Sequence, residues 1–453
     1  MFHKTKEHET DSGSPGIGPV PSRGYVGETH EIRSTTHDAV FGEITEGGPN
    51  YRNVGWIGTT VLMMKTQIGL GVLSIPSTFD VLGLVPGLNH PKVYGIDDVG
   101  GLLFGRVGRE VLGAAFCLYW MFVAGSAMLS ISIALNAVSV HATCTAVFVA
   151  VAAIVIFTLS SIRTLAKISW LAWVGIICIL VSVFTVTIAV GLQERPAAAP
   201  REGVWVPDYQ IIKHPTFTNA ISAISSLVFA YAGTPAFFNI ASEMRDPRHY
   251  TRSLLVSQTV VTITYCVVGI VIYYYCGSYV ASPAPGSAGP LVKKVAYGIA
   301  LPGLLVSGII TAHLPSKHIF VRALRGSRHL AANTVVHWTS WLGCTFGVSL
   351  VAYLIASAIP VFGGLVSLIG ALLGTLMSFQ PMGCMWLYDN WTKGKQNPTL
   401  KWRLMVAWSV FVVASGTFLM IAGTYGTISD IIESYKQDGG SSAWSCADNS
   451  AST

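Results

Sequence analysis

From Gly55 onward the chain alternates apolar runs of about 20 residues, the length that crosses a bilayer, with short polar connections. A run this apolar stays helical in lipid, because every backbone N–H and C=O must be bonded within the protein. By hydropathy we expect about ten spans. They lie near residues 56–86, 111–138, 141–160, 168–192, 217–241, 254–280, 295–321, 334–358, 361–387 and 402–425. The sequence therefore predicts an all-α, multi-span integral membrane protein.

The composition agrees with this fold class. Of the 453 residues, 51% are hydrophobic and 11% are charged, whereas soluble chains carry about 25% charged residues. The net charge of +6 comes from short loops rather than from one basic face, so we expect the lipid bilayer as a partner and no nucleic acid. We expect a disordered, cytoplasmic tail over residues 1–54, a membrane domain over 55–427 and a polar tail over 428–453.

Basic loops set the expected orientation, because Lys and Arg in short loops stay on the cytoplasmic side. They occur at every second connection, as Arg163 and Lys167; Arg245, Arg248 and Arg252; Arg322, Arg325 and Arg328; and Lys393, Lys395, Lys401 and Arg403. Connections 138–141 and 358–361 carry none and are predicted to lie outside, and 193–215 is long enough to translocate whatever its charge. Lys293 and Lys294 are the one local exception.

The same rule leaves the first run inconsistent. The basic segment 87–110 must be cytoplasmic to agree with everything downstream, yet a cytoplasmic tail followed by one crossing would put it outside. Three alternatives remain. The tail is extracellular, the first run re-enters without crossing, or a span is missing between Gly87 and His90.

The cysteines predict no disulfide framework. Six fall inside or at the ends of apolar runs and Cys144 begins another, so we expect small apolar residues rather than paired ones. Cys446, in the polar tail, is the one candidate for a reactive thiol.

Two of the apolar runs are interrupted in mid-membrane, one within residues 65–76 and one within 226–238, each by glycine and proline. Such breaks free backbone polar groups, which lipid tolerates only where they are buried in protein or line a polar cavity. A single kink is usually a matter of packing. Two broken spans in corresponding positions of two halves indicate an inverted-repeat transporter with a binding site near mid-membrane.

At these residues the chain resembles the amino acid/auxin permease family, and more closely the fungal neutral amino-acid permeases of the methyltryptophan-resistance type. The resemblance covers about residues 55–435. It rests on Gly69-Leu70-Gly71-Val72-Leu73-Ser74-Ile75-Pro76, Phe229-Ala230-Tyr231-Ala232-Gly233 and Ser242-Glu243-Met244-Arg245-Asp246-Pro247. It implies the inverted-repeat architecture of the amino acid/polyamine/organocation superfamily, with discontinuous first and sixth spans.

One departure concerns the number of spans, about ten here instead of the family's eleven. In relatives the counterpart of residues 84–87 leads into a complete second span, whereas here Gly87 reaches His90 directly. The charge alternation shows the same deficit independently. An alternative splice product or a gene model that lost an exon would explain it.

A zwitterionic amino acid needs partners for both of its charges in a low dielectric. The N–H groups that open the half-helix after the first break suit the carboxylate, and the carbonyls that end the half-helix before the second suit the ammonium group. The expected substrate-binding residues are Gly69, Leu70, Gly71, Val72, Phe229, Ala230, Tyr231, Ala232 and Tyr119. An aromatic lining favours neutral substrates, and the alternative role for each aromatic is packing.

Lys65 is the expected ion-coupling residue. It lies where sodium-coupled relatives tend to carry Asn, and a fixed ammonium there disfavours sodium. Desolvation favours the neutral amine, which would make Lys65 a proton carrier. The alternatives are snorkelling to the cytoplasmic surface and pairing with Glu243, which is itself expected to form a gate or to cap its span.

No Walker phosphate loop, metal-ligand cluster or nucleophile elbow is found, so we expect no enzyme, ATP-driven pump, metal or cofactor. The resemblance implies proton symport of neutral L-amino acids, aliphatic and aromatic, by alternating access. The plasma membrane is favoured over an internal membrane. The alternative function is a non-transporting sensor or regulatory isoform, because one span is missing.

Overall fold

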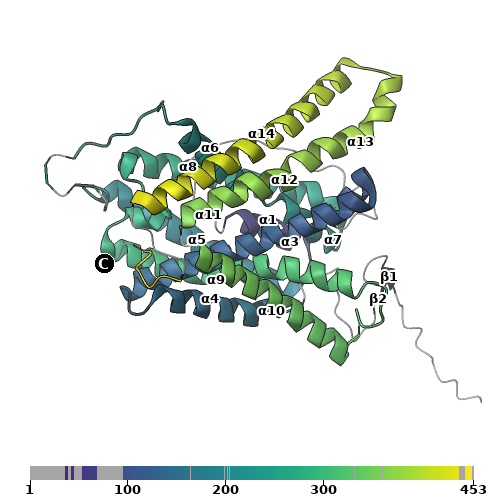
Figure 1. The fold of residues 1–453 in the computed structure, drawn as a ribbon, viewed down its shortest axis with the longest axis horizontal. Helices are drawn as coiled ribbons and strands as arrows, with labels where there is room; N and C mark the ends of the chain where they lie inside the picture. Colours follow the sequence, from purple (N-terminus) through teal and green to yellow (C-terminus); the bar gives the residue numbers. More distant parts are fainter. Residues whose placement is uncertain are drawn as a thin grey trace, which may run out of the picture.

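The computed structural model of the chain is a bundle of long helices (Figure 1). It describes residues 36–38, 42–44, 54–68, 95–163, 165–197, 199–200, 202–203, 205–330, 332–359, 361–437 and 444–450. The α-helices are α1 (Trp56–Gln67), α3 (Ile96–Ser139), α4 (Thr145–Ser160), α5 (Leu165–Leu192), α6 (Phe217–Tyr231), α7 (Thr234–Ser242), α8 (Tyr250–Cys276), α9 (Pro290–Ala323), α10 (Val335–Ala358), α11 (Phe362–Leu368), α12 (Thr375–Ser378), α13 (Gln380–Gln396) and α14 (Leu400–Gln437). Single-turn elements are η2 (Pro247–His249), η3 (Gly277–Tyr279), η4 (Ala284–Ser287) and the π-helical η5 (Ile369–Gly374).

The helical lengths confirm the predicted membrane fold. Within the described residues, 8 helical segments are long and apolar enough to cross a membrane, and the 16-residue α4 is a shorter apolar helix. The helix α1 begins the first predicted span. The break predicted after it, within residues 69–76, lies outside the described residues.

Within the described residues, a difference from the all-helical expectation is a hairpin in the N-terminal tail, where we expected disorder. β1 (Thr36–Asp38) pairs antiparallel with β2 (Gly42–Ile44), with Thr36 opposite Ile44 and Asp38 opposite Gly42. Strands of 3 residues are too short to show the alternation of side chains that predicts a strand from sequence.

The second predicted break is present between α6 and α7. The side chain of Thr216 caps the start of α6 by accepting a hydrogen bond from the Asn219 backbone N–H at 3.4 Å. The helix ends at Tyr231, and Pro235 lies in the first turn of α7, where its missing N–H costs nothing. The sixth span of the family pattern is therefore discontinuous, as predicted.

A second interruption, which we did not predict, divides α3. Gly105 has φ 67° and ψ −151°, a conformation that glycine adopts without the strain of a side chain. The short piece before it folds back so that Asp98 forms an ion pair with Arg109 at 3.2 Å. The piece before the kink, which carries Asp97 and Asp98, is thus a separate helical segment at the end of the span, and Arg106 and Arg109 follow the kink.

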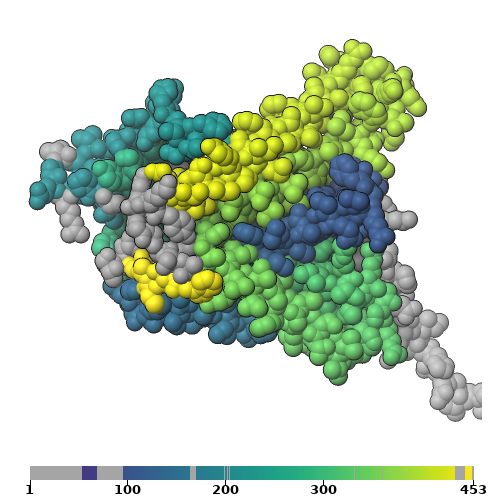
Figure 2. All heavy atoms as spheres, viewed as in Figure 1, coloured from purple at the N-terminus to yellow at the C-terminus, as the bar shows by residue number. Residues whose placement is uncertain are grey.

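Four helices, α3, α4, α9 and α10, pack on one another and are called the scaffold bundle below. The helix α1 packs on α5, α7 and α8, and α6 packs on α11, η5 and α14. The helices α13 and α14 form an antiparallel pair whose turn projects from the molecule at the upper right of Figures 1 and 2.

The starts of α1 and α3 lie at the same end of the molecule. Val54 forms a parallel bridge with Met244, and the Arg252 guanidinium lies 4.2 Å from the Trp56 ring centroid, which places the start of α1 at a basic loop. Asp97, at the start of α3, lies 3.9 Å from His318, beside another basic loop. The start of α1 therefore lies beside the basic loops. Residues 69–94, to which the other two alternatives refer, lie outside the described residues.

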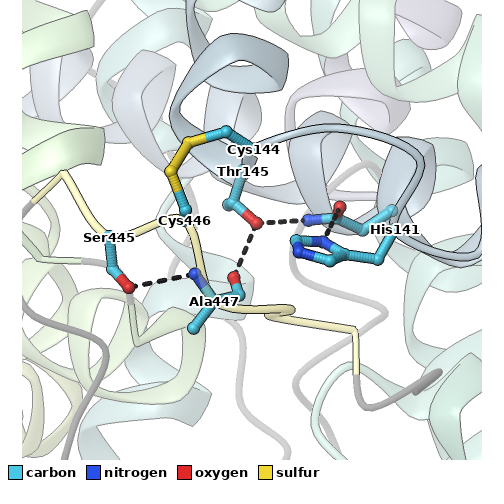
Figure 3. The surroundings of a disulfide bond; sticks show 7 residues. His141, Cys144, Thr145, Ser445, Cys446 and Ala447 are labelled. Atoms are coloured by element: carbon cyan, nitrogen blue, oxygen red, sulfur yellow. Dashed lines mark hydrogen bonds between the residues drawn. A yellow bond between two sulfur atoms is a disulfide. The ribbon is translucent and has the colours of Figure 1, made fainter.

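The prediction that the cysteines are unpaired is wrong for two of them. Cys144, at the start of α4, is disulfide-bonded to Cys446 in the C-terminal tail (Figure 3). Their sequence separation is 302, so no local pattern could reveal the pairing. Among the described residues, Cys117, Cys178, Cys266, Cys276, Cys344 and Cys384 are free, as expected.

Candidate functional site

The carbonyl ends of α1 and α6 meet at one hydroxyl group in the interior. Tyr265, on α8, donates its hydroxyl proton toward the Gln67 carbonyl at 2.7 Å and the Ala230 carbonyl at 3.1 Å. The last carbonyls of a helix have no partner within the helix and carry the negative end of its dipole. Two such ends converge here, so the local field favours a positively charged ligand.

Side chains occupy the other carbonyls of the α6–α7 break. The Tyr119 hydroxyl, from α3, donates to the Ala232 carbonyl at 2.5 Å, and the Gln67 amide donates to the Tyr231 carbonyl at 3.1 Å. The Phe229 carbonyl instead accepts the Ala232 backbone N–H at 3.1 Å. A carbonyl oxygen has two lone pairs, so these groups can accept a further donor.

The predicted aromatic residues gather around this break. Tyr119 is 2% exposed and Phe229 is 6% exposed, while Tyr231 is half-buried with its ring edge-on to Tyr265 at 5.3 Å. The structure thus brings together Tyr119, Phe229, Ala230, Tyr231 and Ala232. The other predicted binding residues, Gly69, Leu70, Gly71 and Val72, lie outside the described residues.

Lys65 is buried between α1, α5 and α9. Its side chain is 1% exposed, and its amine donates to the Ser307 hydroxyl at 2.6 Å. The Ser307 hydroxyl in turn donates to the Gly303 carbonyl at 3.1 Å. A Cβ at Gly175, on α5, would lie only 2.7 Å from Lys65 Cε, so the absence of a side chain there makes room for the lysine.

Neither alternative for Lys65 matches this geometry, because the amine reaches neither the surface nor Glu243. Within the described part of the chain, no carboxylate lies at ion-pair distance from the Lys65 amine. A buried ammonium without a counter-charge is strongly disfavoured.

Glu243 lies at the end of α7 and pairs with Lys317 of α9 at 2.5 Å. The two residues are 2% and 7% exposed. The Glu243 backbone carbonyl also accepts the N–H of Val54, and the Arg245 N–H donates to the Val54 carbonyl at 2.9 Å. This arrangement fastens the start of α1 and the end of α7 to α9, on the side of the basic loops.

Comparison with known proteins identifies the family of the chain. The family described as "Transmembrane amino acid transporter protein" matches residues 89–429, which is most of the chain. The chain belongs to this family. It is accordingly a transporter and not an enzyme.

Fungal relatives match the transporter over almost its whole length. A "Transmembrane transporter" of Gibberella moniliformis is 34% identical and the alignment covers 91% of each chain. An "N amino acid transport system protein" of Neurospora crassa is 31% identical, covering 97% of the transporter and 99% of the relative. A solved sodium-coupled sialic acid symporter aligns with a TM-score of 0.45 at 10% identity, covering 84% of the transporter and 88% of the symporter.

Several residues of the transporter's candidate site escaped the sequence reasoning. Tyr265 and Ser307 lie in apolar runs without a motif, and nothing in the pattern distinguishes them from other hydroxyl residues. Gln67 carries a usable signal, because it is a polar residue immediately before the first predicted break. Nothing in the sequence indicated that Glu243, expected to form a gate or to cap its span, pairs with Lys317.

Proposed function

We propose that the transporter carries neutral L-amino acids, aliphatic and aromatic, by proton symport with alternating access. The observation that carries this proposal is the convergence of the α1 and α6 carbonyl ends on Tyr265. An α-ammonium group would add its N–H donors to carbonyls that already point to one place. The substrate carboxylate would bind the N–H groups of residues 69–72, as expected from the sequence.

The uncharged character of the described site supports neutral substrates. Three uncharged polar side chains are linked at Tyr231. Gln67 donates to the Tyr231 carbonyl at 3.1 Å and accepts from Gln258 at 3.3 Å, and Thr262 accepts from the Tyr231 hydroxyl at 3.4 Å. None of them offers a full charge to a basic or acidic substrate side chain. Tyr119, Phe229 and Tyr231 supply apolar surface beside them, which suits aliphatic and aromatic side chains.

The environment of Lys65 supports a role in proton coupling. A protonated amine is held to α9 through Ser307, while burial among apolar residues opposes the charge. Loading and release of the proton would therefore change the attachment of α1 to α9. Such a change can bias alternating access, because a ligand shifts a conformational equilibrium by its differential affinity for the two states.

The direct test is uptake of labelled leucine and phenylalanine by permease-deficient cells at several external pH values, with lysine and glutamate as competitors. We expect uptake that rises at acidic pH and resists both charged competitors. Lys65→Ala should abolish the dependence on pH, whereas Lys294→Ala, which removes an exposed lysine of α9, should preserve it.

Unchanged pH dependence in Lys65→Ala would remove Lys65 from the mechanism. Absence of uptake by this chain at the cell surface, with uptake by a fungal relative in the same cells, would instead favour the non-transporting regulatory protein. Fluorescent tagging in the same experiment tests the expected plasma-membrane location.

A further inference from the structure

The C-terminal residues 444–450 lie across one end of the scaffold bundle. The Cys144–Cys446 disulfide ties them to the α3–α4 connection, as Figure 3 shows. In Figure 2 the same segment forms the yellow surface patch at the lower left, beside α4 in blue. Cys446 is exposed and Cys144 is partly exposed, so the bond is accessible from solvent.

Hydrogen bonds connect this segment to all four scaffold helices. Thr145 of α4 donates to the Ala447 carbonyl at 2.6 Å, and the Trp444 N–H donates to the Ser357 carbonyl at the end of α10 at 3.2 Å. Lys293 of α9 donates to the Ser450 carbonyl. The contact gives Lys293, the exception to the loop-charge rule, a structural role.

The deepest contact is made by Asn449 with two buried polar residues of α3. Its side-chain oxygen accepts a hydrogen bond from Asn136 at 2.7 Å, and its amide donates to the Ser132 hydroxyl at 3.0 Å. Asn136 and Ser132 are each 0% exposed. The tail thus completes hydrogen bonds that the scaffold helices present at their ends.

Two independent observations place this end of the bundle outside the cytoplasm. The first is the charge alternation: the connection at 138–141 and the tail after α14 are each separated from a basic loop by one span, so both lie on the opposite side of the membrane. Disulfides also persist in oxidising compartments and are rare in the cytosol.

We propose that residues 444–450 form an extracellular clasp that holds the scaffold bundle together, and that external thiols open it and slow transport. A dithiol supplies two electrons and two protons, so the Cys144–Cys446 bond becomes two thiols while the dithiol closes into its own disulfide. The opened clasp then depends on its hydrogen bonds alone. The effect on transport rests on the proposed function, whereas the effect on stability does not.

The test uses the full chain in cells and in detergent. Free thiols are first blocked with a small alkylating reagent; then dithiothreitol is added, and newly formed thiols are counted by the gel shift from a polyethylene-glycol maleimide. We expect two new thiols in the native protein and none in Cys446→Ser. The control is Cys344→Ser, which removes a free cysteine and should leave the two new thiols in place.

The same samples are then compared for leucine uptake and for the melting midpoint of the purified protein. We expect dithiothreitol to lower uptake severalfold and to reduce the midpoint in the native protein, with no further effect on Cys144→Ser/Cys446→Ser. Asn449→Ala, which leaves the cysteines intact, should lower the midpoint as well. No new thiols after reduction, or new thiols with an unchanged midpoint, would overturn the clasp.

If reduction produces new thiols and lowers the melting midpoint but leaves leucine uptake unchanged, the clasp exists but does not control transport. If the untreated protein takes up no leucine, the proposed function fails, and the midpoint still decides whether the clasp exists.

Discussion

Gly175 leaves the space that the Lys65 side chain occupies. The lysine fits between α1 and α9 only because α5 presents a glycine there, with a Cβ position 2.7 Å from Lys65 Cε and 3.0 Å from Val306 Cβ. Contacts this short require a neighbour to move. The position of the amine on Ser307 therefore depends on the backbone of a third helix.

Gly175→Ala should displace Lys65 from Ser307. We expect a loss of about 1–3 kcal/mol of folding stability, typical of overpacking in a core, together with a shifted pH dependence of uptake. The measurements are the melting midpoint in detergent and the uptake profile against pH.

The matched control is Gly343→Ala on α10, because a Cβ there meets no atom within 4 Å. Equal behaviour of the two variants would show that Gly175 does not position the lysine.

At the level of single residues, the sequence indicated several residues of the candidate site but not the residues to which they are hydrogen-bonded. Lys65 stood out as a cation in an apolar run, and Tyr119 and Phe229 do lie at the break. Tyr265 and Ser307 could not be predicted, because a hydroxyl residue in a membrane helix usually bonds to its own helix. Their contacts depend on which helices become neighbours, and that is a property of the packing.

The interrupted helix α6–α7 shows how a break can be kept stable in an apolar interior. Its free carbonyls are not left to solvent; they accept hydrogen bonds from Tyr119, Gln67 and Tyr265, which belong to three other helices. A buried carbonyl without a donor costs about 1–3 kcal/mol. A ligand that donates hydrogen bonds can offset such a cost.

Tyr265→Phe should therefore have opposite effects with and without substrate. Removal of the hydroxyl leaves the carbonyls of Gln67 and Ala230 without this donor, so the melting midpoint should fall in the absence of amino acid. Saturating leucine should raise the midpoint more in this variant than in the native protein, because the ammonium group supplies the missing donor.

Tyr274→Phe, on the exposed face of the same helix, should change neither value. A leucine-induced shift in Tyr265→Phe that is no larger than the native shift would argue against an ammonium site at these carbonyls.

The elements themselves were predictable where proline and glycine mark them. Pro235 and Gly233 identified the α6–α7 break, and the hydropathy runs identified the long helices. The kink at Gly105 and the hairpin of β1 and β2 were missed. Gly105 is one of four glycines within residues 100–108, so the sequence does not single it out, and its φ of 67° is what shows the kink.

Across the whole molecule, the basic loops lie at one end and the clasp at the other. Figure 1 shows the α13–α14 turn at the upper right and the C-terminal segment at the left, with the 193–215 connection at the upper left. The distribution of charge and the arrangement of helices therefore agree on one orientation.

Cysteine labelling in intact cells tests this orientation. His214→Cys, in the 193–215 connection, should react with a membrane-impermeant maleimide, while Lys395→Cys, near the α13–α14 turn, should react only after the membrane is permeabilised. Both side chains are exposed, so differences in burial do not confuse the comparison. The unmodified chain gives the background from its native thiols, and the reverse pattern would invert the topology.

The disulfide also changes the covalent connectivity of the chain. Cys144 and Cys446 close a ring that contains every span from α4 to α14. A protease that cuts one loop within this ring would open it without separating two fragments, and the nicked chain would travel as a single molecule until it is reduced. A single cut releases a piece only if it falls before Cys144 or after Cys446, so in an oxidising environment the helices from α4 to α14 remain one covalent unit after any single cut between the two cysteines.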